Sequence, residues 1–109
     1  MSPLHHHLPR LRTLCRRHHV GRFWAFGSVL REDFGPTSDV DLLYELDHDH
    51  LHGEDSINHF LAFEANLRAS LGHPVDLVWY PGLRNPYFKA EVDETKVLLY
   101  EQTPEKVFG

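Results

Sequence analysis

Two aspartates, Asp39 and Asp41, lie two residues apart and could together bind a divalent cation. The stretch from Val40 to Leu46 is predicted to form a strand, so both side chains point to the same face of a sheet. At a separation of about 6 Å, two carboxylates repel each other by about 3 kcal/mol at an effective dielectric of 20. The pair by itself therefore does not stabilise a fold. Hard oxygen ligands suit Mg²⁺ or Mn²⁺, and a cation between the carboxylates would convert their repulsion into ligation.

A glycine–serine pair, Gly27-Ser28, precedes the aspartates and could hold a phosphate group. Glycine lets a backbone approach a phosphate closely, and free amides at a following helix start can bind phosphate oxygens together with the Ser28 hydroxyl. Arg31, one helical turn further, could reach the same anion. A phosphate site beside a pair of carboxylates is typical of phosphoryl or nucleotidyl transfer.

A third aspartate, Asp76, lies in an otherwise apolar stretch from Val75 to Tyr80 that is predicted to form a strand. If this strand lies beside that of Asp39 and Asp41, three carboxylates converge. Asp76 could then complete a metal site and help to deprotonate an attacking hydroxyl. Each feature alone is more often structural, as a turn residue or a solvated side chain. Their combination in a strand–turn–strand context favours the catalytic interpretation.

The elements that must position these residues alternate along the chain between helices and strands. Predicted helices cover Pro9–Val20, one or two turns within Val29–Asp33, Asp55 or Ser56 to Leu71, and Asn85–Ala90. Predicted strands cover Arg22–Phe26, Val40–Leu46, Val75–Tyr80 and Lys96–Tyr100. This order predicts an α+β fold (α/β-like), with a small mixed β-sheet flanked by helices.

Two further local features follow from the pattern of apolar residues and glycines. Gly21 is expected to end the first helix. The apolar residues of the longest predicted helix line one broad face. Its members are Ile57, Phe60, Leu61, Phe63, Leu67 and Leu71.

Length and composition limit the class of protein. The chain has 109 residues, which fits a single domain covering 1–109. It is 41% hydrophobic and 25% charged, close to the globular average, and no apolar run reaches the ~18 residues of a membrane span. Its single cysteine, Cys15, excludes an internal disulfide framework and fits a reducing cytosol, so we expect a cytoplasmic protein without membrane contact.

The net charge of −5 is unevenly distributed. Six arginines and no acid precede Glu32, and ten acids with no lysine or arginine lie from Glu32 to Glu64. Because phosphate contacts need a basic face, direct nucleic-acid binding is not expected. A histidine-rich stretch, with His48, His50 and His52, could bind a metal, but its polar composition favours ordinary surface histidines in a loop.

The spacing of Gly27-Ser28, ten residues, and then Asp39-Val40-Asp41 resembles the GSx10DxD signature of the DNA polymerase beta-like nucleotidyltransferase superfamily. The small size is similar to that of minimal nucleotidyltransferase (MNT) antitoxins of HEPN/MNT toxin–antitoxin pairs. The resemblance implies the polymerase beta-like fold, with the motif on the first two strands. It also implies that Gly27 and Ser28 hold a nucleotide triphosphate, with Arg31 and Ser38 as further candidate nucleotide ligands.

The same resemblance implies the chemistry. Asp39 and Asp41 would ligate two Mg²⁺ ions, with Mn²⁺ possible, and Asp76 would be the third acidic, catalytic residue. The implied activity is transfer of AMP from ATP to a tyrosine hydroxyl of a cognate HEPN ribonuclease toxin, in a hetero-oligomer. The N-terminal arginines and the aromatics around Tyr80 and Tyr87 are candidate contacts. Alternatives are a non-catalytic antitoxin that acts by stoichiometric binding, and a nucleotidyltransferase acting on RNA or a small-molecule hydroxyl.

Overall fold

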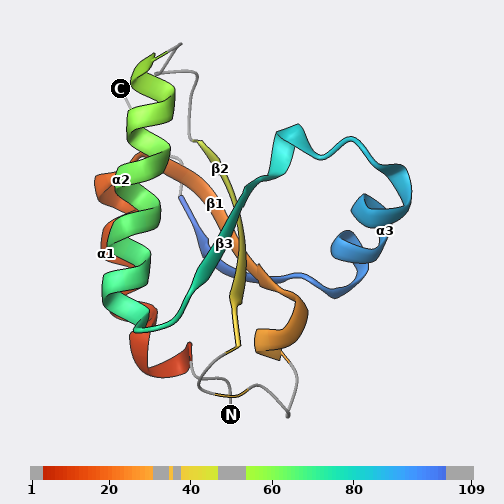
Figure 1. Cartoon of the computed structure of the whole chain (residues 1–109), viewed down its shortest axis with the longest axis horizontal. Helices are drawn as coiled ribbons and strands as arrows, with labels where there is room; N and C mark the ends of the chain where they lie inside the picture. Colours follow the sequence, from red (N-terminus) through yellow and green to blue (C-terminus); the bar gives the residue numbers. More distant parts are fainter. Residues whose placement is uncertain (1–3, 31–34, 36–37, 47–53, 103–109) are drawn as a thin grey trace, which may run out of the picture.

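The protein contains one four-stranded sheet with helices on both faces (Figure 1). The computed structural model describes residues 4–30, 35, 38–46 and 54–102, and all elements named below lie in this part of the chain. The strands are β1 (Val20–Phe26), β2 (Val40–Leu46), β3 (Val75–Trp79) and β4 (Val97–Glu101). Their order is β3-β2-β1-β4, with β2 and β3 parallel and the other neighbours antiparallel. The predicted α+β fold with a small mixed sheet is therefore confirmed.

The two faces of the sheet carry different layers. Helices α1 (Leu8–Arg17) and α2 (Glu54–Leu71) cover one face, and α3 (Pro86–Thr95) lies over the other (Figure 1). Because side chains alternate along a strand, Leu42 packs in the larger cluster under α1 and α2, whereas Leu43 packs in a smaller cluster under α3. Odd-numbered positions of β2, including Asp41, therefore share the α3 face.

The boundary between α1 and β1 differs from the prediction. The helix ends at Arg17 rather than at Val20, because His19 adopts a left-handed φ of 59° that turns the chain toward β1. The prediction that Gly21 ends the helix is wrong, since Gly21 lies within β1 and its carbonyl accepts from the Gln102 amide at 2.8 Å. Left-handed backbone at a histidine is uncommon, so the sequence pattern favoured the glycine.

His18 is buried where α1 meets α2 and is held as a neutral imidazole. Asn66 Nδ2 donates to His18 Nε2 at 3.1 Å, which requires that nitrogen to lack a proton. His59 Nε2 donates to the backbone carbonyl of His18, and the two rings meet edge to face at 5.3 Å. Burial lowers the pKa of His18, and the charges of His59, Arg17 and His19 lower it further.

The stability of the protein is expected to fall as the pH drops from about 7.5 to about 5.5. In the unfolded chain His18 has an ordinary pKa of about 6.5, whereas the folded state holds a lower pKa. The unfolded state therefore binds more protons below about pH 6.5, and acid favours unfolding. Urea midpoints at the two pH values measure the loss. In His18→Gln, which can still accept from Asn66 but does not titrate, the loss should be smaller; an equal loss would contradict this account.

The apolar face predicted for α2 is only partly buried. Phe63, Leu67 and Leu71 pack against the sheet, but Ile57 is 62% exposed and Leu61 is 53% exposed. At about 100° per residue, these two positions lie about 80° and 120° around the helix from the centre of the buried residues. A helix buries only a stripe against a sheet, so the sheet covers the centre of the predicted apolar face and leaves Ile57 and Leu61 at its edge exposed.

Helix α3 is longer than the predicted stretch from 85 to 90. The Asn85 side chain begins the helix by accepting from the amides of Tyr87 at 2.9 Å and Phe88 at 3.2 Å. The second half of the helix buries Val92, which is only 2% exposed, under the smaller cluster. This tertiary contact extends the helix beyond the point at which its local sequence favours it.

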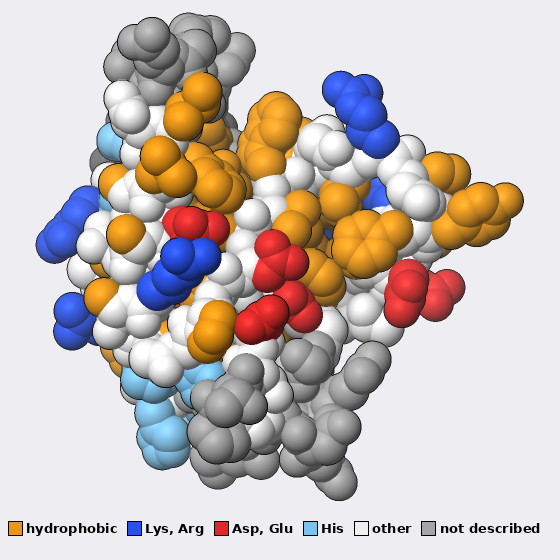
Figure 2. Space-filling view, in the orientation of Figure 1, with side chains coloured by type: hydrophobic (Ala, Val, Ile, Leu, Met, Phe, Trp, Pro, Cys, Tyr) orange, Lys and Arg blue, Asp and Glu red, His pale blue; other side chains and the backbone are white. Residues whose placement is uncertain are grey.

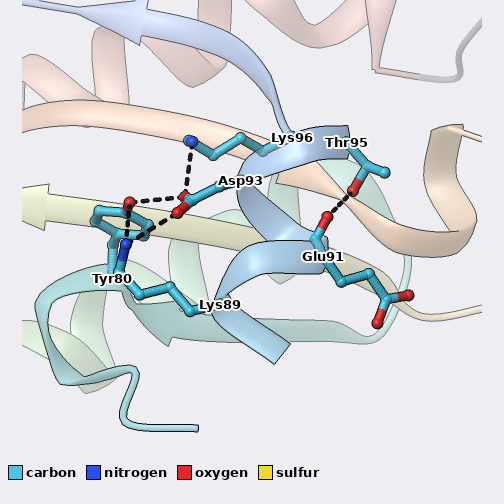
Figure 3. Close-up of polar contacts among 6 residues, drawn as sticks. All are labelled: Tyr80, Lys89, Glu91, Asp93, Thr95 and Lys96. Atoms are coloured by element: carbon cyan, nitrogen blue, oxygen red, sulfur yellow. Dashed lines mark hydrogen bonds and ion pairs between the residues drawn. The ribbon is translucent and has the colours of Figure 1, made fainter. Parts of the chain in front are cut away.

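A polar network fixes the second half of α3 to the sheet (Figure 3). Tyr80 lies in the 3-10 turn η3 (Tyr80–Gly82) after β3, and its hydroxyl donates to Asp93 Oδ1 at 2.7 Å. Lys89 and Lys96 also donate to the Asp93 carboxylate, each at 2.9 Å. Hydrogen bonds from Lys96, Lys89 and Tyr80 hold the pKa of Asp93 well below its usual value. The Tyr80 ring packs on Trp24 of β1, with centroids 5.0 Å apart.

The remaining strands lie close to their predicted positions. β2 matches the prediction, β3 ends one residue earlier at Trp79, and β4 is shifted by one residue. The Cys15 thiol is fully buried, which raises its pKa to about 12 and keeps it protonated. In the described part of the chain, no helix combines the length and apolarity needed to cross a membrane.

Candidate active site

The end of β1 brings Gly27 against the Asp41 carboxylate. The antiparallel register pairs Phe26 with Asp41, and Gly27 follows with a left-handed φ of 72°. A Cβ atom at Gly27 would overlap Asp41 Oδ2 and lie 3.3 Å from Asp41 Cγ. Glycine is therefore required here twice, for its backbone conformation and for the close approach of the carboxylate.

The parallel pairing of β2 and β3 places Asp76 directly beside Asp41. Adjacent strands are about 4.8 Å apart, and the two side chains share the α3 face because they are paired positions. Asp39 precedes β2 by one residue and has the same parity as Asp41. The juxtaposition of Asp76 with Asp41 that the sequence predicted is therefore confirmed; the chemical roles of the three carboxylates stay predictions.

The carboxylates are accessible. Asp39 and Asp76 are exposed and Asp41 is half-buried. Figure 2 shows acidic side chains gathered over β2 and β3, with hydrophobic side chains between them and α3. Like charges held together at a surface oppose folding, so this arrangement is typical of a site that binds a cation.

The three carboxylates offer only hard oxygen donors, which suits Mg²⁺ or Mn²⁺. Gly27 also suits a cation site, because it lacks a Cβ atom and so leaves space next to the Asp41 carboxylate. Within residues 4–30, 38–46 and 54–102, no three His, Cys, Asp or Glu side chains already converge as ligands on one point. Closure of the site would therefore require rotation of these side chains, which the exposure of Asp39 and Asp76 permits.

The structure describes the other predicted nucleotide ligands, Ser38, Gly27, Ser28 and Arg31, to different extents. The Ser38 hydroxyl accepts from the Gly35 amide at 3.1 Å, and the Ser38 amide donates to the Gly35 carbonyl at 3.1 Å, so Ser38 closes a turn before Asp39. Gly27 and the backbone of Ser28 begin the 3-10 turn η2 (Gly27–Leu30). The Ser28 side chain and all of Arg31 lie outside the described residues.

Several other predicted features also lie outside the described residues. They are the remaining part of the predicted helix within Val29–Asp33, most of the turn around Pro36, the histidines at 48, 50 and 52, and the side chains at 55 and 56.

An aromatic wall, consisting of Phe26 and Phe88, borders the site on the α3 side. The two rings meet edge to face with centroids 6.1 Å apart, and Phe26 directly precedes Gly27. Phe88 is 40% exposed, so part of its ring is available to a ligand beside the carboxylates. The sequence pointed only to the neighbouring Tyr87, because the spacing of residues 26 and 88 gives no local signal. The alternation of Trp24 and Phe26 on one strand face was the available clue.

Comparisons with known proteins agree with this geometry. The sequence profile of a family described as "Nucleotidyltransferase domain" matches residues 8–99. No curated protein matches the chain. Among solved structures, a minimal nucleotidyltransferase superposes with a TM-score of 0.71 at 27% identity, covering 89% of this chain and 95% of the other. This is the fold that the sequence predicted.

Two toxin–antitoxin structures have the same fold at lower identity. One, a toxin–antitoxin with AMP-PNP, gives a TM-score of 0.67 at 18% identity over 87% of this chain and 73% of the other. The second contains a tri-AMPylated Shewanella oneidensis HEPN toxin in complex with an MNT antitoxin. It gives a TM-score of 0.60 at 18% identity over 87% and 70% of the two chains. Because the family profile covers most of the sequence and the fold agrees with it, this chain belongs to the nucleotidyltransferase domain family.

Proposed function

We propose that this nucleotidyltransferase transfers AMP from ATP to a tyrosine hydroxyl of a HEPN-type toxin and neutralises the toxin as its antitoxin. The observation that carries the proposal is the register that places Asp76 beside Asp41, against the backbone of Gly27. Three carboxylates and a close-approach glycine on one open face suit a nucleotide triphosphate with its cations.

The residues of the chain have distinct parts in the proposed reaction. The acceptor oxygen attacks the α-phosphorus of ATP, the bond to the β-phosphate oxygen breaks, and pyrophosphate leaves. In this proposal Asp76 would accept the proton of the hydroxyl, and the backbone at Gly27 would admit the triphosphate. Asp39 and Asp41, with Asp76, would hold Mg²⁺ or Mn²⁺. Such ions stabilise negative charge on the attacking and leaving oxygens.

The choice of a protein acceptor has two supports. In the part of the chain that the structure describes, Asp39 and Asp76 are exposed, which leaves room for a macromolecule. Two proteins with the same fold are parts of toxin–antitoxin structures, one described with AMP-PNP and one with a tri-AMPylated HEPN toxin. A complex of this chain with its own toxin is therefore the expected working form.

A labelling assay tests the proposal. The purified protein is incubated with α-labelled ATP, Mg²⁺ and its cognate HEPN-domain protein, and the label is located by electrophoresis and by mass spectrometry of tyrosine peptides. We expect label on the toxin and pyrophosphate release in equal amounts. Tight binding of the toxin without label would contradict the enzyme proposal and favour stoichiometric neutralisation. Label on purified RNA or on a small-molecule hydroxyl, with none on protein, would instead change the acceptor class.

The exposed part of Phe88 is proposed to stack against the nucleotide base. In Phe88→Ala we expect the KM for ATP to rise about 10-fold with a smaller change in kcat, because base–aromatic stacking contributes about 1–3 kcal/mol. The matched control is Tyr87→Ala, since Tyr87 is 86% exposed on the same helix and contributes no ring to the aromatic wall. Equal KM values for the two variants would rule out base stacking on Phe88.

A further inference from the structure

Two hydrogen bonds hold the backbone on either side of Asp39. The amide of Val40 donates to the carbonyl of Pro74 at 2.8 Å. On the other side, His73 Nδ1 lies 3.2 Å from the carbonyl oxygen of Ser38. A carbonyl can only accept, so Nδ1 carries a proton and His73 is the donor. Asp39 is therefore bracketed by contacts from two consecutive residues of another segment.

The segment that makes both contacts is the connection from α2 to β3. Gly72 ends α2 with a left-handed φ of 68°, and its amide donates to the Arg68 carbonyl at 2.9 Å. The chain then runs parallel to the start of β2, since Val75 pairs with Val40. His73 is thereby brought opposite Ser38, three residues before Asp76. The connection leads directly into β3, which carries Asp76, and it contacts the backbone on either side of Asp39.

The His73 contact differs in kind from the hydrogen bonds that Ser38 makes with Gly35. The amide and hydroxyl of Ser38 bond locally to Gly35, which closes a turn but does not fix that turn on the sheet. The His73 side chain connects the turn to the sheet, and its ring is half-buried, so its rotation is restricted. Loss of this donor would free the residue before Asp39 while leaving the β2–β3 ladder in place.

We propose that His73 is a positioning residue for Asp39: its donated hydrogen bond to the Ser38 carbonyl aims the Asp39 carboxylate toward Asp41 and Asp76. This inference rests on the proposed function, because it concerns the same carboxylate site. Groups that orient a metal ligand typically change metal affinity by about 10- to 100-fold when they are removed. His73 itself touches neither nucleotide nor acceptor in this account.

Binding of Mn²⁺ in the presence of a non-hydrolysable ATP analogue provides a test that does not depend on turnover. Free Mn²⁺ is measured by electron paramagnetic resonance with the wild type, His73→Leu and His73→Asn. We expect His73→Leu to bind Mn²⁺ about 10-fold more weakly. His73→Asn should recover most of the affinity, because its amide nitrogen takes the place of Nδ1. The transfer reaction of His73→Leu should require correspondingly more Mn²⁺.

A matched control separates positioning from general loosening of β3. Arg68 Nη2 donates to the Val75 carbonyl at 3.4 Å, so Arg68→Met also removes a side-chain contact with the backbone of this segment, but not one that holds Ser38. Arg68→Met should leave the Mn²⁺ affinity unchanged. Circular dichroism confirms that each variant is folded, and His73→Gln replaces His73→Leu if the latter does not fold.

The outcomes distinguish the inference from the function on which it rests. Wild-type Mn²⁺ affinity in His73→Leu, or equal weakening in His73→Asn and Arg68→Met, would overturn the positioning role while leaving the nucleotidyltransferase proposal intact. Absence of both Mn²⁺ binding and AMP transfer in the wild type would overturn both.

Discussion

Replacing Asp41 with asparagine is expected to reduce AMP transfer at least about 100-fold while leaving the protein as stable as the wild type or more stable. The loss follows from removal of one anionic ligand at the point where charge develops during transfer. The unchanged or higher stability follows because Asp41 is paired directly with Asp76, and removing one of two neighbouring negative charges relieves their repulsion. Opposite effects on activity and stability are typical of a functional site.

The measurement for Asp41→Asn combines initial rates of labelled AMP transfer with thermal unfolding followed by circular dichroism. Asp39→Asn should behave in the same way, since Asp39 shares the face of Asp41. The control is Glu94→Gln, which removes one negative charge from the exposed surface of α3, away from the carboxylates. A wild-type rate of AMP transfer in either aspartate variant would refute the catalytic assignment of these residues. An equal loss of AMP transfer in Glu94→Gln would show that the effect comes from net charge.

Replacing Gly27 with alanine is expected to abolish transfer and also to destabilise the fold. Two penalties combine at this position. The left-handed φ of 72° costs an L-residue about 1–2 kcal/mol, and the new Cβ would overlap Asp41 Oδ2. The carboxylate must then rotate away from the site that it shares with Asp76. We therefore expect a loss of transfer of at least about 100-fold together with a lower unfolding temperature.

Gly72 provides a matched control for the backbone part of this effect. It has a similar left-handed φ of 68°, but a Cβ there would meet nothing within 4 Å. Gly72→Ala should therefore carry only the conformational penalty and retain AMP transfer. The cost of the overlap with Asp41 is measured with the double variant Gly27→Ala/Asp41→Ala. Alanine at position 27 should lower the stability less in the Asp41→Ala background than in the wild-type background, where Asp41 is present. Equal destabilisation in the two backgrounds would show that the carboxylate is not what excludes a side chain from Gly27.

The sequence by itself determined the local half of the site. Gly27 directly follows β1, and Asp39 and Asp41 lie just before and within the antiparallel strand β2, so the register of this one strand pair brings Gly27 against Asp41. β2 was predicted with its observed bounds because five of its seven residues are apolar or aromatic and give a strong strand signal. The same spacing motif identified the nucleotidyltransferase family that the profile match over residues 8–99 shows.

Other local features were not determined by the sequence pattern, for identifiable reasons. The end of α1 was placed three residues late because the turn uses His19 in a left-handed conformation, whereas the sequence offers a glycine two residues later. The sequence pattern grouped the exposed Ile57 and Leu61 with the buried residues of α2, because periodicity shows which residues of a helix are apolar but not how wide a stripe the sheet covers.

Only the tertiary structure decided which distant residues complete the site. Asp76 lies beside Asp41 because β3 pairs in parallel with β2, and a parallel pair requires a crossover such as α2, whose return register is set by core packing and not by local sequence. Phe88 and His73 reach the site in the same way, through the packing of α3 and of the connection after α2. Short-range spacing fixes contacts within a strand pair, whereas contacts across a crossover depend on how the buried faces fit together.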